Sequence, residues 1–117
     1  MPKIVRFEPR PEGASRTVKF EGKDHGTPIS FFAIDYAPGQ GVALHVHPYP
    51  ETWIVRSGRA EFTVDGQKIV AGPGDTVVAE AGAAHGFRNA GDTRLDVVCI
   101  HASDRIVQTF VETEAAA

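Results

Sequence analysis

Short apolar runs separated by turn-forming residues recur along the whole chain at intervals of about ten residues, the pattern of sandwiches and barrels. Twelve glycines and eight prolines are spread through the sequence and mark the turns, whereas helical periodicity is nearly absent. The runs predict strands at residues 4–7, 17–20, 29–36, 42–47, 51–56, 60–64, 67–71, 76–79, 85–89, 95–102 and 106–111. Open sheet edges tend to aggregate, so a domain with this many short strands is expected to close its sheets into a sandwich or a barrel. We therefore predict an all-β fold, a double-sheet jelly roll or a small barrel.

The run at residues 42–47 alternates, and it carries two histidines. Alternate side chains of a strand share a face, so the pattern places Val42, Leu44 and Val46 on one side and Ala43, His45 and His47 on the other. The two imidazoles then point the same way, about 7 Å apart along the strand. Two prolines follow and predict a turn, which brings Glu51 onto the neighbouring strand.

Length and charge limit the class of protein. With 117 residues, the chain is expected to form one domain over residues 1–117. Its net charge is −3 and both signs are interspersed, so the sequence shows no basic cluster of the kind that binds nucleic acid or an anionic membrane. No apolar run approaches the ~18 residues that span a bilayer. The single cysteine, Cys99, cannot form an internal disulfide, which fits a reducing compartment, and a cytoplasmic protein is expected.

A third histidine, His85, follows a glycine-containing turn and begins a predicted strand, so a closed barrel can bring it to His45, His47 and Glu51. Three neutral nitrogens and one carboxylate oxygen suit a divalent first-row transition metal: manganese, iron, cobalt, nickel, copper or zinc. A histidine pair at alternate strand positions is also compatible with ordinary surface or pocket histidines. Spacing alone leaves both interpretations open.

Two spaced motifs resemble those of the cupin family. The first motif is matched at every position and gap by Gly39, His45, His47, Glu51 and Gly58. The second is matched by Gly74, Gly82, His85 and Asn89, with Glu80 standing where the family has a proline. The departure leaves the four candidate ligands in place but puts the geometry of that loop in doubt. The resemblance covers residues 39–102, which form the motif-bearing barrel core.

The resemblance implies a jelly-roll β-barrel, with one metal ion per chain held by His45, His47, Glu51 and His85. It also implies a homodimer, since small single-domain cupins often exchange an N-terminal strand. The N-terminal arm (residues 1–16) and the run at residues 106–111 are candidates for that contact, or they cover their own barrel. Residues 112–117 are expected to be a frayed tail.

Two residues are candidates for proton transfer. His101 ends the strand at residues 95–102, and it is either a general acid/base beside the metal or a satisfied pocket or dimer-contact histidine. Glu51 is the second candidate, if it leaves the metal during a reaction.

Other residues are candidates for a substrate pocket or for ordinary packing. Trp53, Tyr36 and Phe87 are either pocket walls or core residues. Arg56 and Arg88 either hold an anionic substrate or lie at the surface.

The function these features favour is an enzyme that acts on a small organic molecule with vicinal oxygens at a mononuclear metal centre. The resemblance to cupins implies dioxygenase, isomerase or lyase chemistry. The alternative is a non-catalytic module that binds a small metabolite or a sugar.

Overall fold

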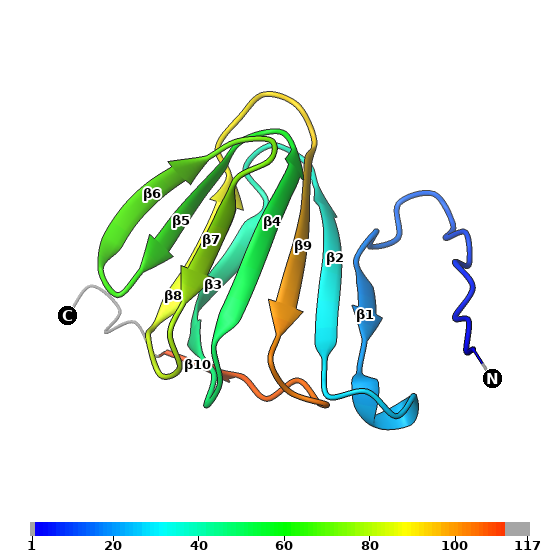
Figure 1. Cartoon of the computed structure of the whole chain (residues 1–117). Coiled ribbons are helices and arrows are strands. Elements are labelled where there is room, and N and C mark those ends of the chain that lie inside the picture. Colours follow the sequence, from blue (N-terminus) through cyan, green and yellow to red (C-terminus); the bar gives the residue numbers. More distant parts are fainter. Residues whose placement is uncertain (1, 112–117) are drawn as a thin grey trace.

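Two five-stranded sheets make up the protein (Figure 1). The computed structural model describes residues 2–111. One sheet has the strand order β1-β2-β9-β4-β7 and the other β10-β3-β8-β5-β6, with antiparallel pairing throughout. The elements are β1 (Val18–Phe20), a short 3₁₀ helix (Gly22–Asp24), β2 (Ser30–Tyr36), β3 (Gly41–Val46), β4 (Glu51–Ser57), β5 (Ala60–Val64), β6 (Gln67–Ala71), β7 (Thr76–Ala79), β8 (His85–Asn89), β9 (Leu95–His101) and β10 (Thr109–Phe110).

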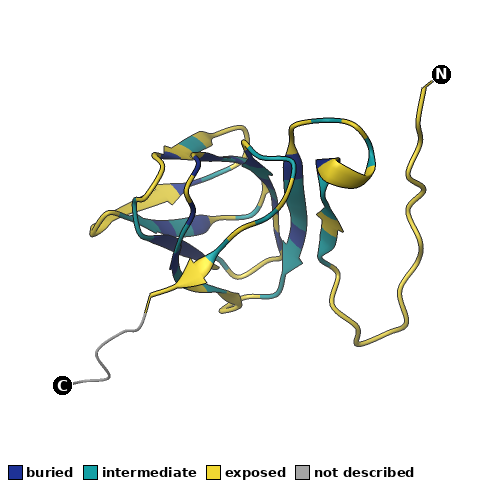
Figure 2. Ribbon diagram, turned by 90° about the horizontal axis from the view of Figure 1, so that it is seen from below, coloured by how far each residue is buried: buried dark blue, intermediate teal, exposed yellow. Residues whose placement is uncertain are grey.

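The core lies between the two sheets and is built by strict alternation. Along β4, Trp53 and Val55 are buried, and along β9 Leu95 and Val97 are buried, while their neighbours in sequence are more exposed. Phe62 on β5 faces them from the other sheet. In Figure 2 the buried stretches of the ribbon, in dark blue, lie along the strands of the two facing sheets. The predicted all-β, jelly-roll (double-stranded β-helix) fold is confirmed. Within residues 2–111, no helix is long and apolar enough to cross a membrane.

The predicted strands match the structure except near the ends of the chain. The prediction at residues 4–7 is wrong: that stretch forms no strand, and the arm at residues 2–16 stands beside β1 with its side chains exposed (Figure 2). The prediction at residues 106–111 is too long, because only Thr109–Phe110 pairs with β3. Ile106 and Val107 are held instead by side chains, through their backbone N–H groups. The tail predicted at residues 112–117 lies outside the described residues.

A β-bulge in β3 changes which residues face the interior. Val42 pairs with Phe87 and His45 pairs with His85, so three steps along β3 match two along β8. As a result Val42 and His45 line the same cavity, and the prediction that they lie on opposite faces is wrong. Gly86 lets the bulge approach, because a Cβ there would lie 2.7 Å from the Val42 carbonyl oxygen.

Residues 103–110, which we call the C-terminal strap, bridge the two sheets at one end of the barrel. On the β1 side, Lys23 N–H donates to the Asp104 carbonyl (2.7 Å) and Ile106 N–H donates to a carboxylate oxygen of Glu21 (3.0 Å). On the other side, β10 pairs with the end of β3. Figure 1 shows the strap passing beneath the strands that carry the candidate ligands.

Candidate metal centre

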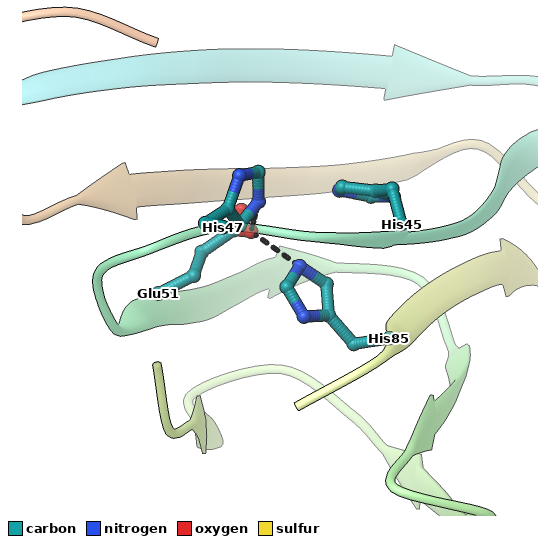
Figure 3. A group of neighbouring side chains, drawn as sticks. All are labelled: His45, His47, Glu51 and His85. Carbon is teal, nitrogen blue, oxygen red and sulfur yellow. Dashed lines mark hydrogen bonds and ion pairs between the residues drawn. The ribbon is translucent and has the colours of Figure 1, made fainter. Parts of the chain in front are cut away.

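Four side chains converge inside the barrel from both sheets (Figure 3). His45 lies on β3, and His47 is the first residue after the end of β3. Glu51 begins β4 and His85 begins β8. Glu51 lies on β4, which pairs with β7 and β9 in the sheet opposite β3, so the prediction that it lies on the strand neighbouring residues 42–47 is wrong. Each offers one potential ligand atom, and these atoms all lie within 4.8 Å of one another. None of the four residues is more than 4% exposed. The structure therefore brings together the four residues that the sequence singled out.

All three histidines are anchored through the same ring nitrogen. Nδ1 of His45 donates to the carbonyl of Ala43 (2.8 Å), and Nδ1 of His85 donates to the carbonyl of Ala83 (2.9 Å). Nδ1 of His47 donates to the carbonyl of Val107 in the strap (2.8 Å). A carbonyl oxygen can only accept, so each Nδ1 carries the proton and each neutral ring keeps a lone pair on Nε2.

Glu51 supplies the negative charge of the cluster. Its Oε1 lies 2.9 Å from Nε2 of His47 and 2.9 Å from Nε2 of His85. Burial alone would raise the pKa of Glu51, but its contacts with His101, His47 and His85 outweigh burial and hold the pKa below its usual value. With neutral rings, the Nε2 lone pairs of His47 and His85 face this carboxylate at Oε1, an arrangement that a bound cation would stabilise. A divalent transition metal fits this donor set.

The turn that carries His85 is retained despite the departure at Glu80. Ala83 N–H donates to the Glu80 carbonyl (3.2 Å), and Gly82 N–H donates to the carbonyl of His47 (2.9 Å). Gly82 has a φ of +80°, which favours glycine. Glu80 itself is exposed, so its side chain does not disturb the loop. This loop therefore fixes His85 beside His47.

A fourth histidine, His101, lies next to the cluster. It is 1% exposed, and its Nδ1 lies 2.6 Å from the hydroxyl of Tyr49. That hydroxyl accepts from Val107 N–H (3.1 Å), so its own proton goes to the nearer acceptor, His101 Nδ1, rather than to the Val107 carbonyl at 3.3 Å. Nε2 of the neutral His101 ring then bears the proton. This Nε2 lies 3.3 Å from Glu51 Oε2 and makes no well-aligned hydrogen bond within the described residues.

A cavity of about 150 Å³ opens beside the cluster. His45, Glu51 and His101 line one end of it, and Tyr36 and Phe87 form part of the wall. Trp53 does not line the cavity: it is fully buried and packs against Phe62 and the ring of His85, with ring centroids 4.9 and 5.0 Å away. Of its two interpretations, core packing is the one that the structure favours.

The two arginines considered as anion-binding residues lie away from this cavity. Arg56 is exposed, and Arg88 forms an ion pair with Glu61 (3.4 Å) while remaining 54% exposed. The motif residue Asn89 has a structural role, since its side-chain amide donates to the carbonyls of Tyr36 (3.0 Å) and Thr93 (2.7 Å).

Sequence reasoning missed Tyr49 and the carbonyl of Val107. Tyr49 is 8% exposed and ties His101 to the strap. Its position between two prolines, in the turn from His47 to Glu51, could have indicated that Tyr49 lies close to the cluster. The Val107 carbonyl has no signal, because every residue type offers the same backbone oxygen.

A two-sheet barrel with a buried cluster of three histidines and a glutamate inside it defines the class of this protein. The model of the Cupin domain matches residues 32–101, which is more than half of the chain, and the chain belongs to the cupin family.

Several solved structures share the fold. A protein with a double-stranded β-helix domain from Klebsiella pneumoniae subsp. pneumoniae is 28% identical, with a TM-score of 0.71 over 89% of this chain and 85% of that one. An oxalate oxidase in complex with the substrate analogue glycolate has a TM-score of 0.73 at 23% identity, over 86% of this chain and 57% of that one. The oxalate decarboxylase of Bacillus subtilis has a TM-score of 0.75 at 23% identity, over 90% of this chain and 30% of that one.

Curated relatives match over a shorter stretch. Mannose-1-phosphate guanylyltransferase of Escherichia coli K12 is 30% identical over 81 residues, and the Salmonella typhimurium enzyme ManC is 28% identical over 81 residues. The match takes in 68% of this chain but spans only 17% of the length of either relative.

Proposed function

We propose that the protein binds one divalent first-row transition metal per chain through His45, His47, Glu51 and His85, and that it acts on a small organic molecule at that centre. One observation carries the proposal. Three Nε2 lone pairs and one carboxylate face one another in a buried site, and each histidine has its other ring nitrogen fixed on a backbone carbonyl. Backbone or carboxylate partners of this kind orient metal-ligating histidines in general.

The reaction class we propose is that of a dioxygenase, isomerase or lyase. A bound metal would supply Lewis acidity or oxygen activation. His101 supports an enzyme rather than a passive binding module, because its Nε2 proton lies at the cavity wall without a well-aligned acceptor. It is placed to donate that proton, or a hydrogen bond, to an oxygen of the substrate. Glu51 stays the second candidate for proton transfer.

The alternative is a module that binds a metabolite or a sugar without turnover. The neutral polar groups of Thr17 and Gln108 at the cavity wall favour it, since they can hold hydroxyl groups. A homodimer and a cytoplasmic location stay predictions. The exposed apolar side chains of the N-terminal arm support the first, and the single buried, unpaired Cys99 supports the second.

Metal titration tests the central claim. The full chain is stripped with EDTA, dialysed, and titrated with Mn²⁺, Co²⁺ or Zn²⁺ while binding and thermal unfolding are followed. We expect one ion per chain and a rise in the unfolding temperature, because an ion that binds only the folded state stabilises it. His47→Ala should abolish both effects. His25→Ala, in a loop outside the cluster, is the matched control and should leave both unchanged. A parent chain that binds no metal, or a His47→Ala chain that binds it equally well, contradicts the proposal.

A second assay separates the enzyme from the binding module. The metal-loaded chain is screened against small molecules with vicinal oxygens for oxygen uptake and for product formation by mass spectrometry. His101→Gln should lose turnover while keeping the metal. Ligand binding without turnover across the screen would favour the module.

A further inference from the structure

We infer that the molecule bound at this centre is a small chelator of no more than one negative charge, carrying an apolar group about the size of a benzene ring. The inference rests on the proposed metal site and names the class of substrate for it. Three features of the cavity carry it: the charges around it, the size and chemistry of its walls, and one buried proton donor without a well-aligned acceptor.

The charges around the cavity favour a monoanion. None of the eleven residues that line it is a lysine or an arginine. A divalent ion with Glu51 and three neutral imidazoles carries a net charge of +1, which one anionic oxygen donor neutralises. His101 adds no charge, because the Tyr49 hydroxyl donates to its Nδ1 and leaves a neutral ring. A dianion would leave an uncompensated negative charge in a buried site, which is costly.

The nearby cations are engaged elsewhere. Arg94 and Arg16 both contact the carboxylate of Asp35, and the Arg94 side chain also donates to the backbone carbonyl of Asp35 (3.0 Å). Ile34 and Tyr36, on either side of Asp35, line the cavity, so the alternation of β2 points Asp35 and its two arginines to the outer face of the sheet.

The walls fit an apolar group of limited size. Phe32, Ile34, Val42 and Phe87 line the cavity, and the rings of Tyr36 and Phe87 stack with centroids 5.8 Å apart. A volume of about 150 Å³ is the size of cavity that accepts benzene when its walls are apolar. The bulge in β3 contributes directly, because it turns Val42 inward beside His45.

One buried donor points to an oxygen of the ligand. Nε2 of His101 is at the metal end of the cavity, is almost fully buried, and has no well-aligned hydrogen-bond acceptor within residues 2–111. Buried polar groups without partners are rare, and a ligand oxygen bound near the metal position would satisfy this one. The ligand class is therefore a bidentate oxygen chelator with an aryl or short branched alkyl group.

Binding of three probes to the Co²⁺-loaded full chain tests the inference, with the visible absorption of Co²⁺ as the readout. Acetohydroxamate and benzohydroxamate are monoanionic when bound and differ only in methyl against phenyl. Oxalate is a dianion without an apolar group. Each affinity is divided by the affinity of the same probe for free Co²⁺. We expect benzohydroxamate to bind at least tenfold more tightly than acetohydroxamate, because the phenyl group buries more apolar surface.

Two variants isolate the effect of charge. Gln108→Arg adds a cation at the cavity wall, and Thr109→Arg adds one at the exposed neighbouring residue, which does not line the cavity. We expect Gln108→Arg to tighten oxalate at least tenfold and Thr109→Arg to change it less than threefold.

Equal affinities of the unaltered chain for the two hydroxamates would overturn the inference, as would oxalate that binds as tightly as benzohydroxamate. A Gln108→Arg variant that gains no more than Thr109→Arg would overturn the argument from charge. Each of these results leaves the metal site standing. A chain that takes up no Co²⁺ overturns the proposed function as well, so the two failures are distinguishable.

Discussion

Each candidate ligand histidine at this centre has already committed one ring nitrogen to the backbone. The carbonyls of Ala43, Ala83 and Val107 accept the Nδ1 protons, so in the neutral form of each ring the Nε2 lone pair faces inward. Protonation of Nε2 would place an imidazolium in a buried site. Among the three rings, His45 is the one whose pKa is lowered by burial.

Burial lowers the pKa of His45, and this effect outweighs the opposing hydrogen bond to the Ala43 carbonyl. In the unfolded chain a histidine takes up its proton below about pH 6.5, whereas folded His45 stays neutral to lower pH. The unfolded state then binds more protons, so the free energy of unfolding falls as pH falls below about 6.5, by up to ~1.4 kcal/mol per pH unit. Urea unfolding of the EDTA-treated chain at pH 7.5, 6.5 and 5.5 measures this slope.

His45→Gln removes the titrating ring and should flatten the slope, and equal slopes in both chains would refute the assignment. With metal bound, the same rings must stay neutral. Metal occupancy should therefore also fall as pH drops toward and below about 6.5.

Tyr49 offers a second test on a single residue. Its hydroxyl joins His101 Nδ1 (2.6 Å) to the backbone N–H of Val107 (3.1 Å). Tyr49→Phe leaves the buried His101 ring and the part-buried Val107 N–H without this partner, and it should lower the free energy of unfolding by about 1–3 kcal/mol. Because Tyr49 positions His101, the ring nitrogen NMR signals of His101 should also shift toward a mixture of tautomers.

Tyr36→Phe is the matched control, since the Tyr36 hydroxyl makes no hydrogen bond within the described residues. It should cost less than about 0.5 kcal/mol and leave the His101 signals unchanged. Equal costs for the two variants would mean that the Tyr49 hydroxyl has no special role.

The sequence was sufficient to select His45, His47, Glu51 and His85, because these residue types stand at the fixed spacings of the two motifs. It was not sufficient for what holds them. The anchors are backbone carbonyls, which no residue type signals, and Tyr49 meets His101 across 52 residues of sequence. Contacts of this kind depend on how strands close into a barrel, and a local pattern does not encode them.

Among the elements, β3 and β8 determine the shape of the site. The bulge brings Val42 and His45 onto one side, and it requires β3 to approach Gly86 closely. A methyl group at Gly86 would lie 2.7 Å from the Val42 carbonyl oxygen and 3.1 Å from the Ala43 carbonyl carbon. Both neighbours are backbone atoms, so they cannot move aside without displacing the bulge.

Gly86→Ala should therefore lower the free energy of unfolding by about 1–3 kcal/mol, the usual cost of overpacking. It should also weaken metal binding, because His85 is the adjacent residue and His45 ends the bulge. Gly72→Ala is the control: a Cβ there meets nothing within 4 Å, and the change should stay within about 0.5 kcal/mol. Chemical denaturation and metal titration of both variants decide the matter. A Gly86→Ala chain that matches its parent would show that the bulge tolerates a side chain.

The elements themselves were largely predictable. Apolar alternation and turn residues placed β2 and β4–β9 within a residue or two. Strands such as β4 and β9 bury one face against the other sheet, whereas the mostly exposed β6 is bounded by its turn residues. The alternation pattern gave the wrong face for Val42, because the bulge adds one residue to β3. A bulge leaves the residue types of a strand unchanged and alters only which of them face the interior. The pattern also failed at residues 4–7, where apolar side chains occur without a partner strand in the described chain.

Over the whole molecule, the N-terminal arm does not fit a compact monomer. The radius of gyration is 14.7 Å, against about 13 Å expected for a compact chain of this length. The arm contributes Ile4, Val5 and Phe7 with exposed fractions of 68%, 60% and 72%. Large apolar side chains gathered on one exposed segment mark an interaction site. A second copy of the chain is the partner that the sequence led us to expect.

Replacing Ile4, Val5 and Phe7 together by serine should convert a dimer to a monomer, because it removes the apolar surface that association would bury. Light scattering coupled to size-exclusion chromatography measures the mass of each form. The matched control replaces Val70 and Val78 by serine; each is 58% exposed, and they lie on β6 and β7, away from the arm. It should leave the dimer intact. Metal stoichiometry should stay at one per chain in every form, since all four candidate ligands come from residues 45–85 of a single chain. A parent chain that runs as a monomer at micromolar concentration would refute the dimer and leave the metal centre untouched.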